Sequence, residues 1–158
     1  MAKRLCTIGY SGYSLEDFVQ VLHRNQVKCL FDIREIPISR KRGFSKSALS
    51  QALSHVGIEY RHLRVLGSPR RDRHRLRETD DYRTFFRRMT AHLAGIEAVE
   101  GVREVVRLAG EQTSCLMCCC PDWQRCHRKA VVEAIRNLTS FTIVHLRNTD
   151  GHVILKAA

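Results

Sequence analysis

The sequence opens with an alternation of apolar strand-like runs and an amphipathic helical segment, and this alternation restricts the possible folds more than any other feature. Arg4–Gly9 is a short apolar run that ends in glycine, which predicts a strand. Apolar residues then recur at helical spacing after Ser14. Val27–Arg34 is mostly apolar, as is typical of a parallel strand buried on both faces. Strand, helix and strand within about thirty residues predict a βαβ unit.

The rest of the chain continues this alternation. We predict helices after Ser45, from about Asp80, over Glu97–Leu108 and over Lys129–Leu138, and strands over Ile58–Leu63, Ser114–Cys119, Phe141–Leu146 and His152–Leu155. The first part of the segment 61–88 reads as a loop, and the turn 148–151 indicates an antiparallel hairpin. We therefore predict one α/β domain over residues 1–158. It has three layers, with helices flanking a mostly parallel central sheet.

Composition limits the compartment and the partner. The 158 residues contain 27 Lys+Arg against 16 Asp+Glu, a formal net charge of +11, and 21 of the cations are arginines. Arginine suits bidentate recognition of phosphate, so we expect an anionic partner, a nucleotide or nucleic acid. Seven cysteines, an odd number, suit a reducing cell better than a disulfide framework. Without a signal-peptide segment or a run of about 20 apolar residues, we expect a cytoplasmic protein with no membrane partner.

Five of the seven cysteines lie within twelve positions, at the end of a predicted strand and the start of the next helix. A helix N-terminus and a neighbouring arginine both lower the pKa of a thiol and make it a better nucleophile. We therefore predict catalytic roles for Cys118 and Cys126, with His127 as a base. Alternatively, Cys115 and Cys119 pack in the core as small apolar residues.

The same region offers ligands for a metal. Thiolate and imidazole groups bind zinc, and thiolates hold iron–sulfur clusters. The spacing lacks the two separated pairs of a zinc ribbon, so we favour no metal and no other cofactor. If zinc or an iron–sulfur cluster is bound, we expect the ligands to be Cys118, Cys120, Cys126 and His127.

Polar residues also follow the first two predicted strands. In open α/β sheets, ligands bind beyond the carboxyl ends of the strands. We predict an acid–base role for Asp32, although a structural ion pair with Arg34 is an alternative. The residues predicted to bind the anionic part of a substrate are Tyr10, Ser11, Arg34, Ser39 and Arg128.

Arginine is concentrated in one part of the chain. Ten of the 21 arginines lie between Arg61 and Arg88. A charge run of this kind is either a solvated face or a surface that binds nucleic acid. For a nucleic-acid face we name Arg40, Arg42, Arg70, Arg71, Arg73 and Arg75.

The order of the motifs resembles the family known as domain of unknown function 488. The shared motifs are Thr7–Ser11, Asp32–Arg34 with Pro37 and Ser39, Phe44, Gly57–Tyr60, Leu66–Gly67 and a late cysteine followed by Cys126–Arg128. The resemblance extends to about residue 138 and implies the fold rather than a reaction. Cys120 stands where the family pattern has glutamate, and Ser68 where it has glycine. The missing carboxylate strengthens the metal or redox alternative.

These observations support three hypotheses from different classes. The leading one is an enzyme that acts on a nucleotide or nucleic acid through a Cys/His/Arg pocket at the carboxyl edge of the sheet. The second is a nucleic-acid-binding module without catalytic activity. The third is a redox sensor that uses its thiols alone or with bound metal.

Overall fold

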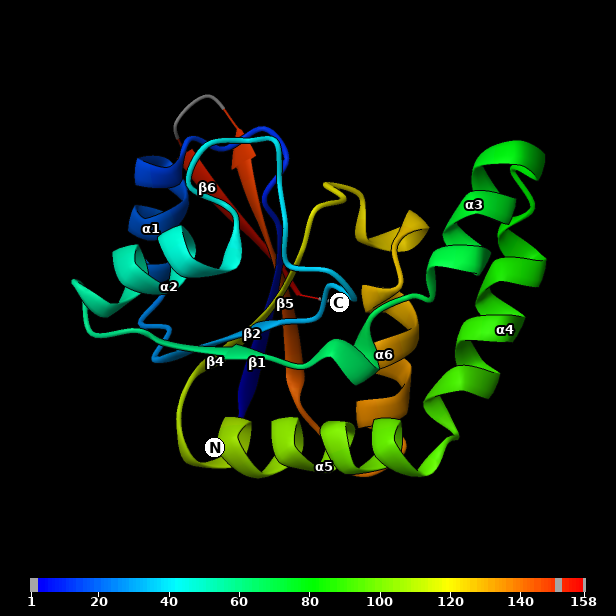
Figure 1. Cartoon of the computed structure of the whole chain (residues 1–158). Helices are drawn as coiled ribbons and strands as arrows, with labels where there is room; N and C mark the ends of the chain where they lie inside the picture. The colour runs from blue at the N-terminus through cyan, green and yellow to red at the C-terminus, as the bar shows by residue number, and fades with distance from the viewer. Residues whose placement is uncertain (1–2, 150–151, 158) are drawn as a thin grey trace.

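A six-stranded sheet forms the centre of the computed structural model, which describes residues 3–149 and 152–157 (Figure 1). The strands are β1 (Arg4–Gly9), β2 (Cys29–Asp32), β3 (Glu59–His62), β4 (Ser114–Cys118), β5 (Thr142–Thr149) and β6 (His152–Ala157). Their order is β3-β2-β4-β1-β5-β6. The first five in this order run parallel to one another, and β6 pairs antiparallel with β5. The predicted parallel sheet and hairpin are confirmed.

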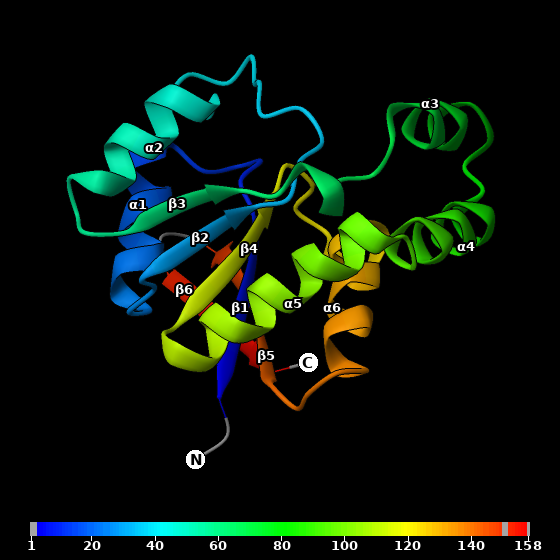
Figure 2. The same ribbon diagram turned by 60° about the horizontal axis from the view of Figure 1, so that its bottom comes forward.

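Six α-helices surround the sheet, together with the 3-10 turns η1 (Arg64–Leu66) and η2 (Trp123–Arg125). The helices are α1 (Leu15–Arg24), α2 (Lys46–Ser54), α3 (Arg70–Thr79), α4 (Tyr82–Leu93), α5 (Ile96–Glu111) and α6 (Arg128–Arg136). Figure 2 shows α1 and α2 on one side of the sheet and α5 and α6 on the other. None of the helices in the described ranges is long and apolar enough to cross a membrane.

Each strand contributes to two hydrophobic cores because its side chains alternate between the faces of the sheet. Cys6 and Leu30 pack with α1 and α2, whereas Leu5 and Phe31 pack with α4, α5 and α6. All four side chains are fully buried. Both faces of the parallel strands are therefore covered, which explains their nearly continuous apolar sequence.

Local signals account for most helix boundaries. The Ser14 hydroxyl caps α1 by accepting a hydrogen bond from the backbone N–H of Asp17 at 3.1 Å. Ser45 precedes α2 without such a bond, and its hydroxyl instead accepts a hydrogen bond from the Ser39 N–H at 3.0 Å. Gly57 has a left-handed conformation, with φ of 73°, and lies beyond the helix end at Ser54.

The largest departure from the sequence prediction is α3, which occupies a stretch predicted to be a loop. Arginine has nearly the helix propensity of alanine, and Pro69 stands at the N-terminal boundary. The helix packs mainly on α4, and a polar contact joins the two helices: Arg88 donates a hydrogen bond to the buried Asp72 at 3.0 Å. A helix held in this way has no continuous apolar stripe in its sequence. Helix α5 also continues through Gly110 to Glu111, past its predicted end.

Candidate active site

A cavity of about 440 Å³ opens where the loops after β2 and β4 face helix α3. Tyr10, which follows β1, also lines it. Three kinds of side chain form most of the wall. They are a sulfur and imidazole group (Cys118, Cys119, Cys120, Cys126, His127), four arginines (Arg34, Arg73, Arg77, Arg125) and an apolar group (Ile36, Ile38, Leu76, Phe85).

Cys126 lies at the centre of the sulfur group, just before helix α6. Its Sγ is 2.8 Å from the Sγ of Cys118 and 3.7 Å from the Nδ1 of His127. The backbone N–H of Arg128 donates to the same sulfur at 3.4 Å. Hydrogen-bond donors therefore converge on Cys126 from the end of β4 and the start of α6.

A backbone carbonyl fixes the position of one proton on the His127 ring. Its Nε2 lies 2.7 Å from the carbonyl oxygen of Ile33, an atom that can only accept a hydrogen bond. Nε2 therefore carries a proton, and Nδ1 is the ring nitrogen that faces the Cys126 sulfur. In this orientation His127 can take a proton from the Cys126 thiol.

The surroundings shift the pKa values of these two thiols in opposite directions. Burial opposes ionisation of Cys126, but hydrogen bonds from Cys118 and Cys120, together with His127, hold its pKa well below the usual value. Burial, and then the contact with Cys126, raise the pKa of Cys118. Cys126 is thus the more acidic thiol of the pair, and Cys118 is the one that keeps its proton when Cys126 ionises.

Arg128 compensates the thiolate charge from beneath the cavity wall. Its side chain is only 1 % exposed and donates to the Thr7 hydroxyl at 3.2 Å and to the Cys120 carbonyl at 2.7 Å. Within the described residues it forms no salt bridge with a carboxylate, and its Nε has no hydrogen-bond partner. Burial opposes the charge of Arg128, but the Cys118 and Cys126 sulfurs raise its pKa. Arg128 does not line the cavity, although we predicted that it binds the anionic part of a substrate.

Asp32 and Arg34 form a buried ion pair. The carboxylate accepts hydrogen bonds from Arg34 Nε at 2.9 Å and Nη2 at 2.7 Å, and also from the Tyr60 hydroxyl. Asp32 is fully buried and does not line the cavity. Its contacts are therefore those of a structural ion pair with Arg34, the alternative to an acid–base role. Arg34 does line the cavity, and its Nη1 lies 3.4 Å from the Tyr10 hydroxyl.

The remaining predicted substrate contacts are divided between two places. Tyr10 lines the main cavity, and its hydroxyl donates a hydrogen bond to the Ser39 hydroxyl at 3.0 Å. Ser11 lines a separate hollow of about 540 Å³ that also includes Gly9 and Arg147. The structure therefore brings Tyr10, Arg34, Cys118, Cys126 and His127 to one cavity, and leaves Asp32, Ser11, Ser39 and Arg128 outside it.

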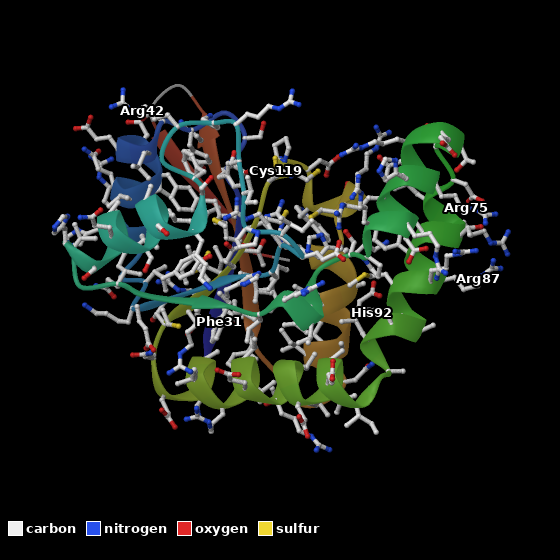
Figure 3. The ribbon with its side chains drawn as sticks, viewed as in Figure 1. Phe31, Arg42, Arg75, Arg87, His92 and Cys119 are labelled. Carbon is white, nitrogen blue, oxygen red and sulfur yellow. The ribbon has the colours of Figure 1, made fainter. Side chains whose placement is uncertain are left out.

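Helix α3 divides the predicted nucleic-acid residues between its two sides. Arg70, Arg71 and Arg75 are exposed and line an open groove of about 730 Å³ on its outer side. Arg73 instead turns toward the main cavity and pairs with Glu35 at 2.7 Å. Figure 3 shows Arg75 and Arg87 on the α3–α4 side of the molecule.

The other two predicted arginines of that face lie elsewhere. Arg40 and Arg42 precede α2. In Figure 3, Arg42 is at the opposite side of the molecule from Arg75. The structure therefore does not bring the six arginines onto one continuous face.

Two cationic contributors to the cavity escaped sequence analysis. Arg77 lies one helical turn after Arg73 on α3, so recognition of that helix would have identified both. Arg125 directly precedes Cys126 and stacks over Tyr82, with its guanidinium 5.7 Å from the ring centroid. The two cysteines expected to pack in the core also differ, because Cys115 is buried whereas Cys119 is exposed at the cavity.

The predicted metal ligands partly converge. The ligand atoms of Cys118, Cys126 and His127 all lie within 4.8 Å of one another, a spacing that one metal ion could bridge. Cys120 is the fourth predicted ligand, but its sulfur does not belong to this group. The same atoms are thus suited either to thiol chemistry or to metal binding.

Comparison with known proteins identifies one family. The family model described as "Domain of unknown function DUF488" matches residues 14–135. This span includes both Asp32–Arg34 and Cys118–Arg128, and it confirms the resemblance suggested by the motifs. Neither the curated proteins nor the solved structures gave a match.

Proposed function

The chain belongs to the DUF488 family, and we propose that it is a thiol-dependent enzyme that acts on a nucleotide or nucleic acid. Cys126 is the nucleophile and His127 its base. The observation that carries this proposal is the set of groups around one sulfur atom. The Cys126 Sγ has Cys118 at 2.8 Å, the Arg128 N–H at 3.4 Å and the His127 Nδ1 at 3.7 Å. Such surroundings activate a cysteine for nucleophilic attack.

The composition of the cavity supports a substrate with anionic and apolar parts. Four arginines line it against a single carboxylate, Glu35. Ile36 and Ile38 stay exposed beside them, at 46 % and 73 %. Arginines recognise phosphate, and apolar side chains pack against the flat face of a base. A volume of about 440 Å³ is also within the usual range for small-molecule sites.

Each residue has a distinct part in the proposed reaction. His127 Nδ1 takes the Cys126 proton, and the sulfur then forms a bond to an electrophilic atom of the substrate. The bond to the leaving group breaks, and His127 returns the proton to that group. Water then displaces the sulfur from the bound substrate atom, and one water proton restores the Cys126 thiol. Arg34 and Arg77 bind phosphate oxygens. Arg128 is a positioning residue that keeps the thiolate charge compensated.

Substrate screening tests the proposal. The protein is incubated with a panel of nucleotides and short DNA and RNA strands, and the products are followed by mass spectrometry. We expect turnover that is lost in Cys126→Ser and strongly reduced in Arg34→Ala. Cys119→Ser, which removes an exposed cavity thiol, is the matched control and should retain activity. Full activity in correctly folded Cys126→Ser would overturn the proposal.

The exposed arginines of α3 support a second candidate, a nucleic-acid-binding module without catalysis. Arg70, Arg71 and Arg75 line an open groove, as a surface that binds the phosphate backbone would. In this case, affinity for DNA or RNA falls steeply with salt, and no product forms. Arg71→Glu should weaken binding, whereas Arg103→Glu on the exposed side of α5 is the control. For either candidate we propose the cytoplasm, whose reducing conditions keep the cysteines free.

A further inference from the structure

We propose that Cys118 and Cys126 form a reversible disulfide that switches the thiol site off. The two sulfur atoms are already 2.8 Å apart, and a disulfide bond is about 2.0 Å long. The effect of the disulfide on activity rests on the proposed function, in which Cys126 is the nucleophile. The disulfide itself can form whether or not the protein is an enzyme. Cys118 is then the resolving thiol.

The fold holds the two cysteines in different elements that meet at the cavity. Cys118 ends β4 in the middle of the sheet, and Cys126 follows η2 just before α6. Both sulfurs are largely buried, but both residues line the cavity. Hydrogen peroxide in the cavity can therefore reach them.

The proposed oxidant is hydrogen peroxide, which reacts in two steps. Cys126 loses its proton to His127, and its sulfur attacks the terminal peroxide oxygen. An S–O bond forms, the O–O bond breaks, and the released hydroxide takes a proton and leaves as water. The Cys118 sulfur then attacks the sulfenic acid of Cys126. The S–S bond forms, the S–O bond breaks, and the hydroxide leaves as water with the Cys118 proton.

Two neighbouring thiols could compete with Cys118, and their contacts argue against both. The Cys120 thiol is directed to the carbonyl oxygen of Asp122 at 3.4 Å and to that of Arg125 at 3.9 Å. Cys119 follows the strand end and is exposed. Cys120 also helps to lower the pKa of Cys126, but the sulfur that lies 2.8 Å from Cys126 is that of Cys118. The geometry therefore selects Cys118 as the partner.

The disulfide removes the nucleophilic thiol from the site and also the negative charge that Cys126 carries when it ionises. In the disulfide, Cys126 carries no negative charge to offset the buried Arg128. The His127 Nδ1 also loses the proton donor it faces at 3.7 Å. Reduction by a dithiol restores both groups, because the exchange regenerates two thiols and oxidises the dithiol.

Peptide mapping tests the disulfide. The reduced full-length protein is treated with an equimolar amount of hydrogen peroxide, remaining thiols are blocked with N-ethylmaleimide, and peptides are identified by mass. We expect one cross-link, Cys118–Cys126, that dithiothreitol reverses. It should be lost completely in Cys118→Ser and unchanged in Cys119→Ser and Cys120→Ser. Cys118→Ala provides a second, apolar replacement if the serine variant folds poorly.

Trapping of the intermediate separates the roles of the two cysteines. In Cys118→Ser, the sulfenic acid of Cys126 should persist and react with dimedone, and in Cys126→Ser no cross-link should form. A cross-link from Cys126 to Cys119 or Cys120, or a metal that co-purifies and protects all these thiols, would overturn the assignment. These masses do not depend on turnover. A mapped Cys118–Cys126 link together with full activity of Cys126→Ser would therefore reject the proposed enzyme function and leave the disulfide standing.

Discussion

The end of β1 touches the loop after β4 so closely that a Cβ atom on Gly9 would lie 1.8 Å from the carbonyl oxygen of Cys120. The same carbonyl accepts a hydrogen bond from Arg128 Nη2 at 2.7 Å. Glycine at this position therefore allows the contact that orients the buried guanidinium.

Gly9→Ala should consequently destabilise the protein. The added methyl displaces the Cys120 carbonyl and weakens its bond to Arg128, at a cost of about 1–3 kcal/mol for overpacking alone. Urea unfolding measures this loss. The control is Gly110→Ala in α5, where the only close atom is the flexible tip of Lys3 and the helix should gain about 0.5–1 kcal/mol. Equal stabilities of the two variants would contradict the role given to Gly9.

The pH dependence of alkylation tests the Cys126 thiolate. Because hydrogen bonds from Cys118 and Cys120 keep its pKa well below the ordinary 9.0 against the effect of burial, iodoacetamide should label Cys126 at half its maximal rate well below pH 9. Peptide masses identify the labelled cysteine. A half-maximal rate near pH 9 would show that these neighbours do not activate it.

The same thiolate links stability to pH. The folded pKa of Cys126 is below the unfolded value, so folding releases a proton in the interval between them. The stability of the wild type relative to Cys126→Ser should therefore rise from the folded pKa up to about pH 9, and then level off. Urea unfolding of both proteins across this interval measures the difference, and parallel curves would contradict it.

Asp32→Asn should destabilise the protein more than loss of an ordinary ion pair. The substitution removes the charge that compensates Arg34 in a site where Asp32 is fully buried and Arg34 only 7 % exposed. Breaking a buried pair in this way costs about 3–5 kcal/mol. Glu59→Gln breaks an exposed pair with Arg61 and should cost less than about 1 kcal/mol. Similar midpoints for the two variants in urea would refute the assignment of Asp32 as a structural anchor.

His145 should make the fold sensitive to acid. Burial, and then the charges of Arg128 and Arg147, lower its pKa from 6.5 to about 4. The unfolded chain binds the proton first, so the free energy of unfolding falls as pH drops from about 6.5 to about 4. The full effect is about 3 kcal/mol at 1.36 kcal/mol per unit. His145→Gln, which can still accept a hydrogen bond from Thr7, should flatten this part of the pH profile in chemical denaturation.

The sheet was predictable because its strands carry their own signals. The strands β1, β2 and β4 are apolar runs with glycine or a polar loop at the end, and both of their faces are buried. Helix α3 was not predictable in this way. Its arginines are mostly solvent-exposed, so no apolar periodicity distinguishes the helix from a charged loop.

The candidate site was predictable only in its composition. Sequence order places Cys126, His127 and Arg128 together, but it cannot tell which of them faces a ligand. That choice depends on contacts made by distant residues, namely the Ile33 carbonyl for His127 and the Thr7 hydroxyl for Arg128. A buried arginine and a substrate-binding arginine look the same in one sequence, because tertiary packing decides between them.

Helix α3 packs mainly on α4, and α4 on α6, so the α3–α4 pair stands at one edge of the protein (Figure 1). The sulfurs of Cys118 and Cys126 belong to the end of β4 and to the residues just before α6, and their contact with each other does not involve α3. The sequence of α3 can therefore change the cavity wall, through Arg73 and Arg77, without altering the contact between Cys118 and Cys126. Substitutions on the cavity side of α3 would thus change which ligands fit the cavity while leaving the sulfur group intact.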